Sequence, residues 1–182
     1  MFNIVNYGLE ASTECLTESG YILIANWTNG VKVAQFDPSN NTLSYVEPLR
    51  RTIRYPAGVV GGKFDVVHIK NDAVDIIVAS EHSFMCRVQG QPSWQKIMAK
   101  DMPLKFAIPV CDNKLVFRPQ LVHDYKKVDS VYTGLLYSFV MPTGAFVARR
   151  KGKVFIVGGH EPEVFREMSI PPVKMDDVEQ AA

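Results

Sequence analysis

The sequence predicts an all-β fold built from antiparallel hairpin and meander units. Almost every apolar segment is short and rich in valine, isoleucine, phenylalanine and tyrosine, the residues that favour strands. Clusters of glycine, proline, asparagine and aspartate separate these segments, as turns do between strands. No longer window shows the 3.6-residue period of an amphipathic helix. We expect either a β-sandwich or barrel, or a small propeller-like array of about four blades.

Composition indicates one globular domain. The chain has 182 residues, of which 47% are hydrophobic and 21% charged, enough to bury a core. We expect a single all-β domain over residues 1–168 and a polar C-terminal tail over residues 169–182, where Pro171-Pro172 and Asp176-Asp177 interrupt the apolar pattern. No run of 18 apolar residues exists, so no membrane span is expected.

The first half of the chain has the pattern of hairpins joined by tight turns. Thr28-Asn29-Gly30 and Asp37-Pro38-Ser39-Asn40-Asn41 have typical turn chemistry. The polar segment Leu9–Ser19 is expected to be a turn of helix or a loop. Strands are expected at Phe2–Val5, Tyr21–Trp27, Val31–Phe36, Thr42–Val46, Ala57–Val60, Phe64–Ile69, Val74–Ala79, Phe84–Val88 and Trp94–Met98.

The second half repeats the hairpin theme with longer segments. His123–Lys127 is expected to be an exposed loop, and Val131–Val140 one long strand with a bulge at Gly134. The other strands are expected at Ala107–Cys111, Ala145–Ala148, Lys153–Val157 and Val164–Phe165.

Two hairpin units in this half are similar to each other. The unit that starts at Met102-Pro103 and the unit that starts at Met141-Pro142 both continue to a strand led by lysine, Lys114 and Lys153. The second unit ends on Gly158-Gly159. Such self-similarity is typical of repeat folds.

These units resemble the kelch repeat of β-propellers in patches around residues 36–42, 91–117 and 141–159. Lys153–Gly159 resembles the lysine-led strand that ends in a glycine pair, and Phe36–Thr42 resembles the kelch turn. The unit ending at Phe117 departs from the pattern, because Arg118-Pro119 stands where a glycine pair is expected. The resemblance implies four-stranded blades, each covered by its neighbours.

No arrangement typical of a catalytic, metal or cofactor site stands out. Gly58–Phe64 lacks the spacing of a phosphate-binding loop. The histidines, His68, His82, His123 and His160, are too scattered to predict a metal site. Cys86 and Cys111 lie in apolar strands and are expected to be buried, inert thiols. We therefore predict no catalytic residue, no metal and no cofactor.

Two basic clusters are the candidate partner-binding residues. They are Arg50, Arg51 and Arg54, and Arg149, Arg150 and Lys151. The favoured interpretation of both clusters is a charged hairpin tip that is solvated, and contact with phosphate groups or an acidic partner is the alternative. The net charge of +1 gives no general indication of nucleic-acid binding, so nucleic acid is a less favoured partner than protein.

Absence of catalytic patterns leads to the prediction of a non-enzymatic structural or interaction protein. It would self-associate or dock through β edges and loops, for example as a subunit of a virus or phage particle. One alternative is a propeller-like enzyme or ligand-binding protein with a central pocket near Arg54, His68 or His160. A second alternative is a binder of nucleic acid or acidic partners.

The cysteines and the first residues of the sequence indicate the cellular compartment in which the protein is expected. Cys15, Cys86 and Cys111, an odd number at wide spacing, indicate reduced thiols. The first residues lack the pattern of a secretory signal. We expect a cytoplasmic protein, or one assembled into a particle in the cytoplasm.

Overall fold

The computed structural model describes residues 7–58, 61–88 and 91–158. Within these ranges the chain forms strands and short 3-10 turns, the latter at Ile24–Asn26, Pro56–Gly58 and Ala99–Asp101. The strands are β1 (Leu9–Glu10), β2 (Glu14–Thr17), β3 (Gly20–Leu23), β4 (Val33–Asp37), β5 (Thr42–Val46), β6 (Arg50–Arg54), β7 (Phe64–Lys70), β8 (Asp75–Ala79), β9 (Ser83–Val88), β10 (Gln95–Met98), β11 (Phe106–Cys111), β12 (Phe117–Val122), β13 (Lys126–Tyr132), β14 (Leu136–Val140), β15 (Ala145–Arg150) and β16 (Lys153–Gly158). The all-β prediction is confirmed.

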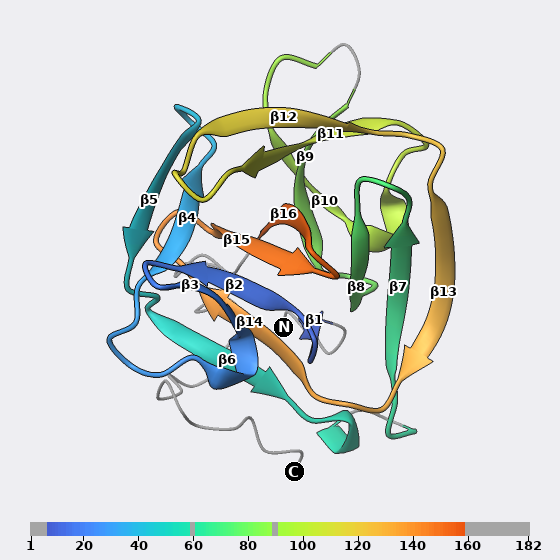
Figure 1. The fold of residues 1–182 in the computed structure, drawn as a ribbon. Coiled ribbons are helices and arrows are strands. Elements are labelled where there is room, and N and C mark those ends of the chain that lie inside the picture. The colour runs from blue at the N-terminus through green and yellow to red at the C-terminus, as the bar shows by residue number, and fades with distance from the viewer. Residues whose placement is uncertain (1–6, 59–60, 89–90, 159–182) are drawn as a thin grey trace.

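The strands pair into two curled antiparallel sheets (Figure 1). The first sheet has six strands in the order β13-β7-β8-β1-β14-β6. The second has ten strands and follows the path β12-β11-β9-β16-β15-β2-β4-β5, with β10 on β9 and β3 on β2. The first strand of the described chain, β1, lies between β8 and β14, so strands distant in sequence hold the N-terminal segment.

Local turn chemistry explains the hairpins. The β15–β16 turn is made by Lys151 and Gly152, with φ of 51° and 76°. Positive φ at both central residues is the geometry that matches the twist of two paired strands. The β4–β5 turn contains Asn41 in the same left-handed region, which asparagine tolerates better than most residues.

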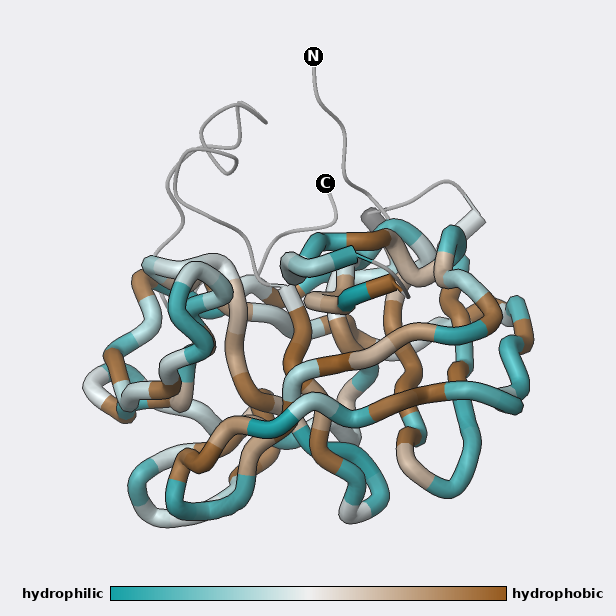
Figure 2. Tube along the Cα trace, turned by 90° about the horizontal axis from the view of Figure 1, so that it is seen from above, coloured by the Kyte–Doolittle hydropathy of each residue, from teal (hydrophilic) through white to brown (hydrophobic). Residues whose placement is uncertain are grey.

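Aromatic side chains fill the main core. Trp27 and Phe146 each pack edge-on against Phe139, with ring centroids 5.4 Å and 5.2 Å apart. All three side chains are fully buried. Burying side chains of this size stabilises the fold by about 1.5–3 kcal/mol each. Hydrophobic residues accordingly lie along the strands that cross the body, whereas hydrophilic residues gather mostly in the loops at its lower rim (Figure 2).

The kelch-like propeller is not the architecture. The two similar units become the hairpins β11–β12 and β15–β16, and both belong to the same ten-stranded sheet, joined through β9. In a propeller they would form separate radial blades. Their similarity therefore reflects hairpin patterning, in which the same alternation and turn residues recur wherever two strands pair.

Several segments differ from the sequence expectations. The expected strand Tyr21–Trp27 ends at Leu23 and is followed by the 3-10 turn Ile24–Asn26. β13 begins inside the expected loop His123–Lys127, and β12 begins only at Phe117, after the strand expected from Lys114. Leu9–Ser19 contains strands β1 and β2 rather than a helical turn or a loop, because their partners cover both. Val131–Val140 is divided between β13 and β14, which lie at different positions of the first sheet. Residues 56–58 form a 3-10 turn where a strand was expected to begin at Ala57. The expected strands Phe2–Val5 and Val164–Phe165 and the tail lie outside the described residues.

No helix in the described part of the chain has the length and apolar character needed to span a membrane. The expected compartment stays a prediction.

Candidate functional site

His82 is a buried histidine in the turn between β8 and β9. Only 1% of the surface of His82 is exposed. The backbone is fixed on both sides, because His82 N–H donates to the Ala79 carbonyl at 3.0 Å and the His82 carbonyl accepts from Ala99 N–H at 2.9 Å. Burial, aided by the nearby charge of Lys96, lowers the pKa of His82 to about 3. The imidazole is therefore neutral at neutral pH.

Both ends of the described chain reach this histidine. The ring of Tyr7 packs on the ring of His82, with centroids 4.9 Å apart. At the other end, the backbone of Gly158 faces the imidazole. A Cβ at Gly158 would lie 2.7 Å from Ser83 Oγ, so a side chain there would require Ser83 to shift. The fold thus brings residues 7 and 158 to one place.

Gly8 is held in an unusual backbone conformation next to this meeting point. Its carbonyl accepts a hydrogen bond from Ala79 N–H at 2.9 Å. Its φ is +123°, and a Cβ would lie 2.8 Å from the Cβ of Leu136. An L-residue with a side chain would be strained in both respects. Only glycine fits between β8 and β14 here.

Some buried side-chain hydroxyls have no hydrogen-bond partner among the described residues. They include those of Ser138 and Thr52. Ser138 and Thr52 are cross-strand partners on β14 and β6. Buried polar groups are almost always paired, so such a group requires an explanation.

The cysteines do not contribute an activated thiol. Cys15, Cys86 and Cys111 are free and buried. Burial raises the pKa of Cys15 and Cys86 to about 12 and that of Cys111 to about 11. A thiol with such a pKa is protonated at neutral pH and is a weak nucleophile. The prediction that Cys86 and Cys111 are buried is confirmed.

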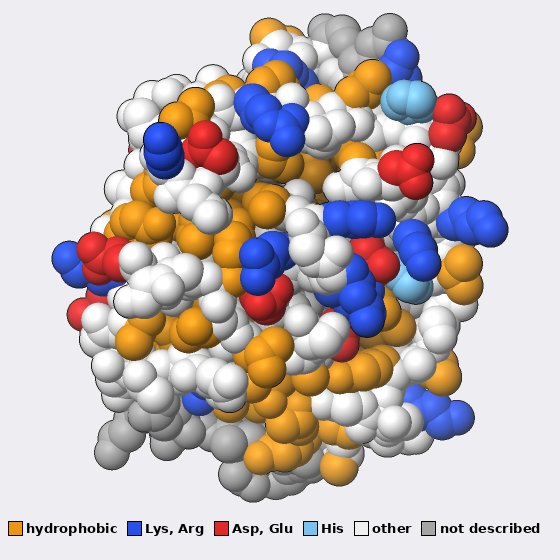
Figure 3. Space-filling model, in the orientation of Figure 1, with side chains coloured by type: hydrophobic (Ala, Val, Ile, Leu, Met, Phe, Trp, Pro, Cys, Tyr) orange, Lys and Arg blue, Asp and Glu red, His pale blue; other side chains and the backbone are white. Residues whose placement is uncertain are grey.

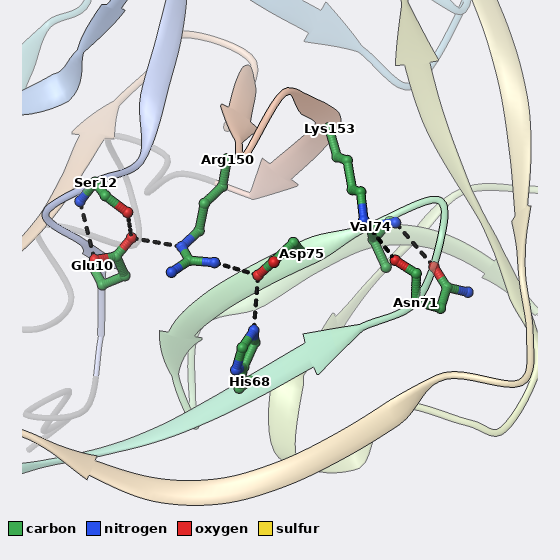
Figure 4. A network of polar contacts seen from close by, with 8 residues as sticks. All are labelled: Glu10, Ser12, His68, Asn71, Val74, Asp75, Arg150 and Lys153. Atoms are coloured by element: carbon green, nitrogen blue, oxygen red, sulfur yellow. Dashed lines mark hydrogen bonds and ion pairs between the residues drawn. The ribbon is translucent and has the colours of Figure 1, made fainter.

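A buried charge network anchors β1 (Figure 4). Arg150 Nε of β15 donates to Glu10 Oε1 of β1 at 2.7 Å, and its Nη1 pairs with Asp75 on β8. His68 Nε2 of β7 lies 2.8 Å from the same Asp75 carboxylate. Burial would raise the pKa of Asp75, but the hydrogen bond with His68 and the charge of Arg150 outweigh it and lower this pKa. The network fixes β1 two residues after Gly8.

The predicted partner-binding arginines lie in two different sheets. Arg50, Arg51 and Arg54 are on β6 of the first sheet, and Arg149 and Arg150 are on β15 of the second. Both groups make contacts inside the domain. Figure 3 shows basic and acidic side chains intermixed near the centre of one face rather than a patch of one sign.

Contacts within the domain engage these guanidinium groups, those of Arg51, Arg149 and Arg150 among them. Arg51 Nη1 donates to the carbonyls of Ala25 and Trp27, each at 3.0 Å. Arg149 makes a two-point contact with Glu14, at 2.8 Å and 3.0 Å. Arg150 belongs to the buried network described above. Lys151 is exposed at the β15–β16 turn. Partner binding by these residues, and self-association, stay predictions.

The structure does not place Arg54 and His68, two of the residues expected near a central propeller pocket, in a common site. Arg54 ends β6, and His68 belongs to the buried network on β7. His160 lies outside the described residues.

Sequence reasoning missed Tyr7, Gly8 and Ser138, and it singled out His82 only as one of four scattered histidines. A signal was present for two of them. His82 is a polar residue between two buried apolar strands, and Ser138 interrupts the apolar segment Leu135–Met141. The pairing that brings them near Gly8 has no local signature.

Comparison with solved structures identifies the architecture. The AceL NrdHF class 3 split intein, in a splice-inactive variant, matches with a TM-score of 0.72 at 18% identity, covering 84% of this chain and 97% of that one. A KlbA intein precursor from Methanococcus jannaschii matches with a TM-score of 0.65 at 14% identity, covering 89% and 96%. A bacterial intein-like domain from Clostridium thermocellum matches with a TM-score of 0.61 at 17% identity, covering 85% and 99%. The chain has the intein fold.

Sequence comparison adds nothing to this result, since no family model and no curated protein matches the chain. The intein fold overturns the resemblance to kelch propellers. It also overturns the prediction of a structural virus or phage subunit and the prediction that the chain is not an enzyme, because the similar structures are inteins and an intein-like domain. The candidate site is assembled from residues far apart in the sequence, such as Tyr7, His82 and Gly158, and local sequence patterns do not reveal it.

Proposed function

We propose that this chain is an intein-like autoprocessing domain that breaks a peptide bond of its own backbone. The observation that carries the proposal is the neutral, fully buried imidazole of His82 at the place where residues 7 and 158 meet. A domain that cleaves its own chain must hold the cleaved bond next to the groups that catalyse the cleavage. The names of the similar structures, which are inteins and an intein-like domain, support the same class of activity.

The Tyr7–Gly8 bond is the proposed point of cleavage. Tyr7 packs on His82, and the Gly8 carbonyl is fixed by Ala79. The bond is thereby held beside the imidazole of His82 while β1 is anchored by the Glu10–Arg150 ion pair. Positioning of this kind supplies a large part of catalysis, since it removes the need to bring the reacting groups together.

His82 is the proposed proton-transfer group. A neutral imidazole accepts a proton at one nitrogen while the other carries one, and the Gly158 backbone faces the imidazole of His82. Breaking an amide bond requires a proton on the departing nitrogen, here that of Gly8. Because the described thiols are protonated and buried, the proposed reaction does not depend on a thiol-reducing environment.

A fusion of residues 1–182 between two different reporter domains tests the proposal. Time courses at neutral pH should show the fusion converting to shorter products, and His82→Ala should slow this conversion by about 100-fold or more. His123→Ala is the matched control, because His123 is an exposed histidine whose side chain is 54% accessible. It should process at the rate of the unchanged chain.

Two results would overturn the proposal. One is a fusion that stays whole between pH 6 and pH 9 although circular dichroism shows a folded β protein. The other is conversion at the same rate in the His82→Ala variant, which would indicate cleavage by a contaminating protease.

A further inference from the structure

Strand β13 forms one edge of the six-stranded sheet. It pairs with β7 along its whole length, from Lys126 opposite Lys70 to Tyr132 opposite Phe64, and with no other strand of the described chain. In Figure 1 it runs along the outer margin of the molecule. Residues 126–131 are all exposed. One row of the backbone N–H and C=O groups of β13 is therefore open to a further strand.

The side chains of β13 restrict which strand can pair there. Lysine on an edge strand deters pairing with unrelated strands, but Val128 and Val131 are 54% and 57% exposed on the same edge. Asp129 follows Lys127 by two residues, so these opposite charges project from the same face of the strand. An incoming strand is favoured where its acidic residue lies across from Lys127 and its basic residue across from Asp129.

A second copy of β13 offers this arrangement. In an antiparallel pair of identical strands, residues opposite each other project from the same face, so only every second alignment is possible. With Val128 on the two-fold axis, Lys127 of each copy lies opposite Asp129 of the other. The alignment centred on Lys127 places two lysines together, and the one centred on Asp129 places two aspartates together. The charges therefore select one register.

We propose that β13 is a dimer interface, which pairs antiparallel with β13 of a second copy of this chain, with Val128 on the two-fold axis. Residues 126–130 of the two copies form the ladder, and the two six-stranded sheets become continuous. Such an interface is isologous and contains two Lys127–Asp129 pairs. Lys127 exchanges its contact with the Lys100 carbonyl for the carboxylate of the second copy.

The dimer is weak and sensitive to salt, because the ladder is short and its ion pairs are exposed. It is also independent of the proposed function. Cleavage between Tyr7 and Gly8 leaves β13 in the larger fragment, so a chain that never cleaves itself dimerises equally well.

Sedimentation equilibrium of the full chain, between about 10 μM and 1 mM, tests the interface. Lys127→Glu sets two acidic pairs in the ladder and Asp129→Lys sets two basic pairs, so each should raise the dimer Kd at least about 10-fold. An equimolar mixture of these two variants should dimerise as well as the unchanged chain, because every pair is again of opposite charge.

Lys126→Glu is the matched control, because it reverses a charge on the same strand at a position that lies opposite Ser130 in the proposed register. It should change the dimer Kd much less than Lys127→Glu does. An unchanged chain that is monomeric at about 1 mM would overturn the proposal. So would a dimer that survives both charge reversals, or a mixture of the two variants that stays monomeric.

Cross-linking through introduced cysteines tests the register separately. Val128→Cys places two thiols opposite each other, with Cα atoms about 4.5–5.5 Å apart, a separation that a disulfide spans. Ser130→Cys places them four residues apart along the ladder, about 13 Å, which a disulfide does not span. Under mild oxidation the first variant should form a covalent dimer and the second should not, while the native cysteines stay buried. Equal cross-linking of both variants, or of neither, would contradict this register.

Discussion

At the scale of single residues, we expect His82 to make the stability of the fold depend on pH. Its pKa is about 3 in the folded chain against an ordinary value of 6.5. Between these values the unfolded chain binds a proton at this residue and the folded chain does not. The free energy of unfolding therefore falls as pH falls below 6.5, by about 1.4 kcal/mol per pH unit at the steepest, and this contribution is fully present above pH 6.5.

Unfolding by urea at pH 7, 6, 5 and 4 checks this expectation. The variant His82→Gln has no titrating group at this position, so its free energy of unfolding should depend less steeply on pH between 6.5 and 4. His123→Gln, at an exposed histidine, should keep the slope of the unchanged chain. Equal slopes in all three proteins would show that residue 82 is not a buried neutral imidazole.

Residue chemistry was predictable where it depends on burial alone. Cys86 and Cys111 lie in apolar strands, and from that context an inert thiol follows. His82 has a comparable context, but its sequence neighbours do not indicate that Tyr7 packs on it from the start of the chain. The role of a side chain depends on its spatial partners, which local sequence does not contain.

At the scale of elements, the neighbouring residues Arg149 and Arg150 should differ strongly in their effect on stability. Arg150 lies between the buried carboxylates of Glu10 and Asp75. Arg150→Met leaves both carboxylates without this partner, which should destabilise the fold by about 3–5 kcal/mol. Arg149→Met removes an ion pair whose side chains are 32% and 24% exposed, and should cost about 1 kcal/mol or less.

Guanidinium chloride unfolding of both variants distinguishes these magnitudes. Each replaces arginine by an unbranched side chain in the same strand, so the variants are matched for strand propensity and differ in the burial of the charges. An Arg149→Met variant as unstable as Arg150→Met would contradict the account of the network that anchors β1.

Element positions were largely predictable, since apolar alternation and turn residues are local properties. The strand Thr42–Val46 was predicted with the bounds it has, and those at Phe64, Phe84 and Lys153 were placed to within a residue or so. β1 and β2 were missed, because Leu9–Ser19 is polar and short. Their strand conformation is imposed by pairing with β8, β14, β15 and other distant strands.

At the scale of the whole molecule, the pairing of strands could not be predicted. A period of two residues shows that a segment is a half-buried strand, but not which strand lies beside it. The two similar hairpins were therefore compatible with separate blades, whereas they share one sheet. The contacts of β1 with β8 and β14, which create the meeting of the two chain ends, join residues across most of the chain.

The central claim, that the domain breaks its own Tyr7–Gly8 bond, is tested most directly by intact-mass analysis of the purified full-length chain during incubation at pH 7. The account predicts a growing species whose first residue is Gly8, together with the complementary fragment ending at Tyr7, and neither in His82→Ala. A chain that keeps its full mass, or a new end at any other residue, would contradict it.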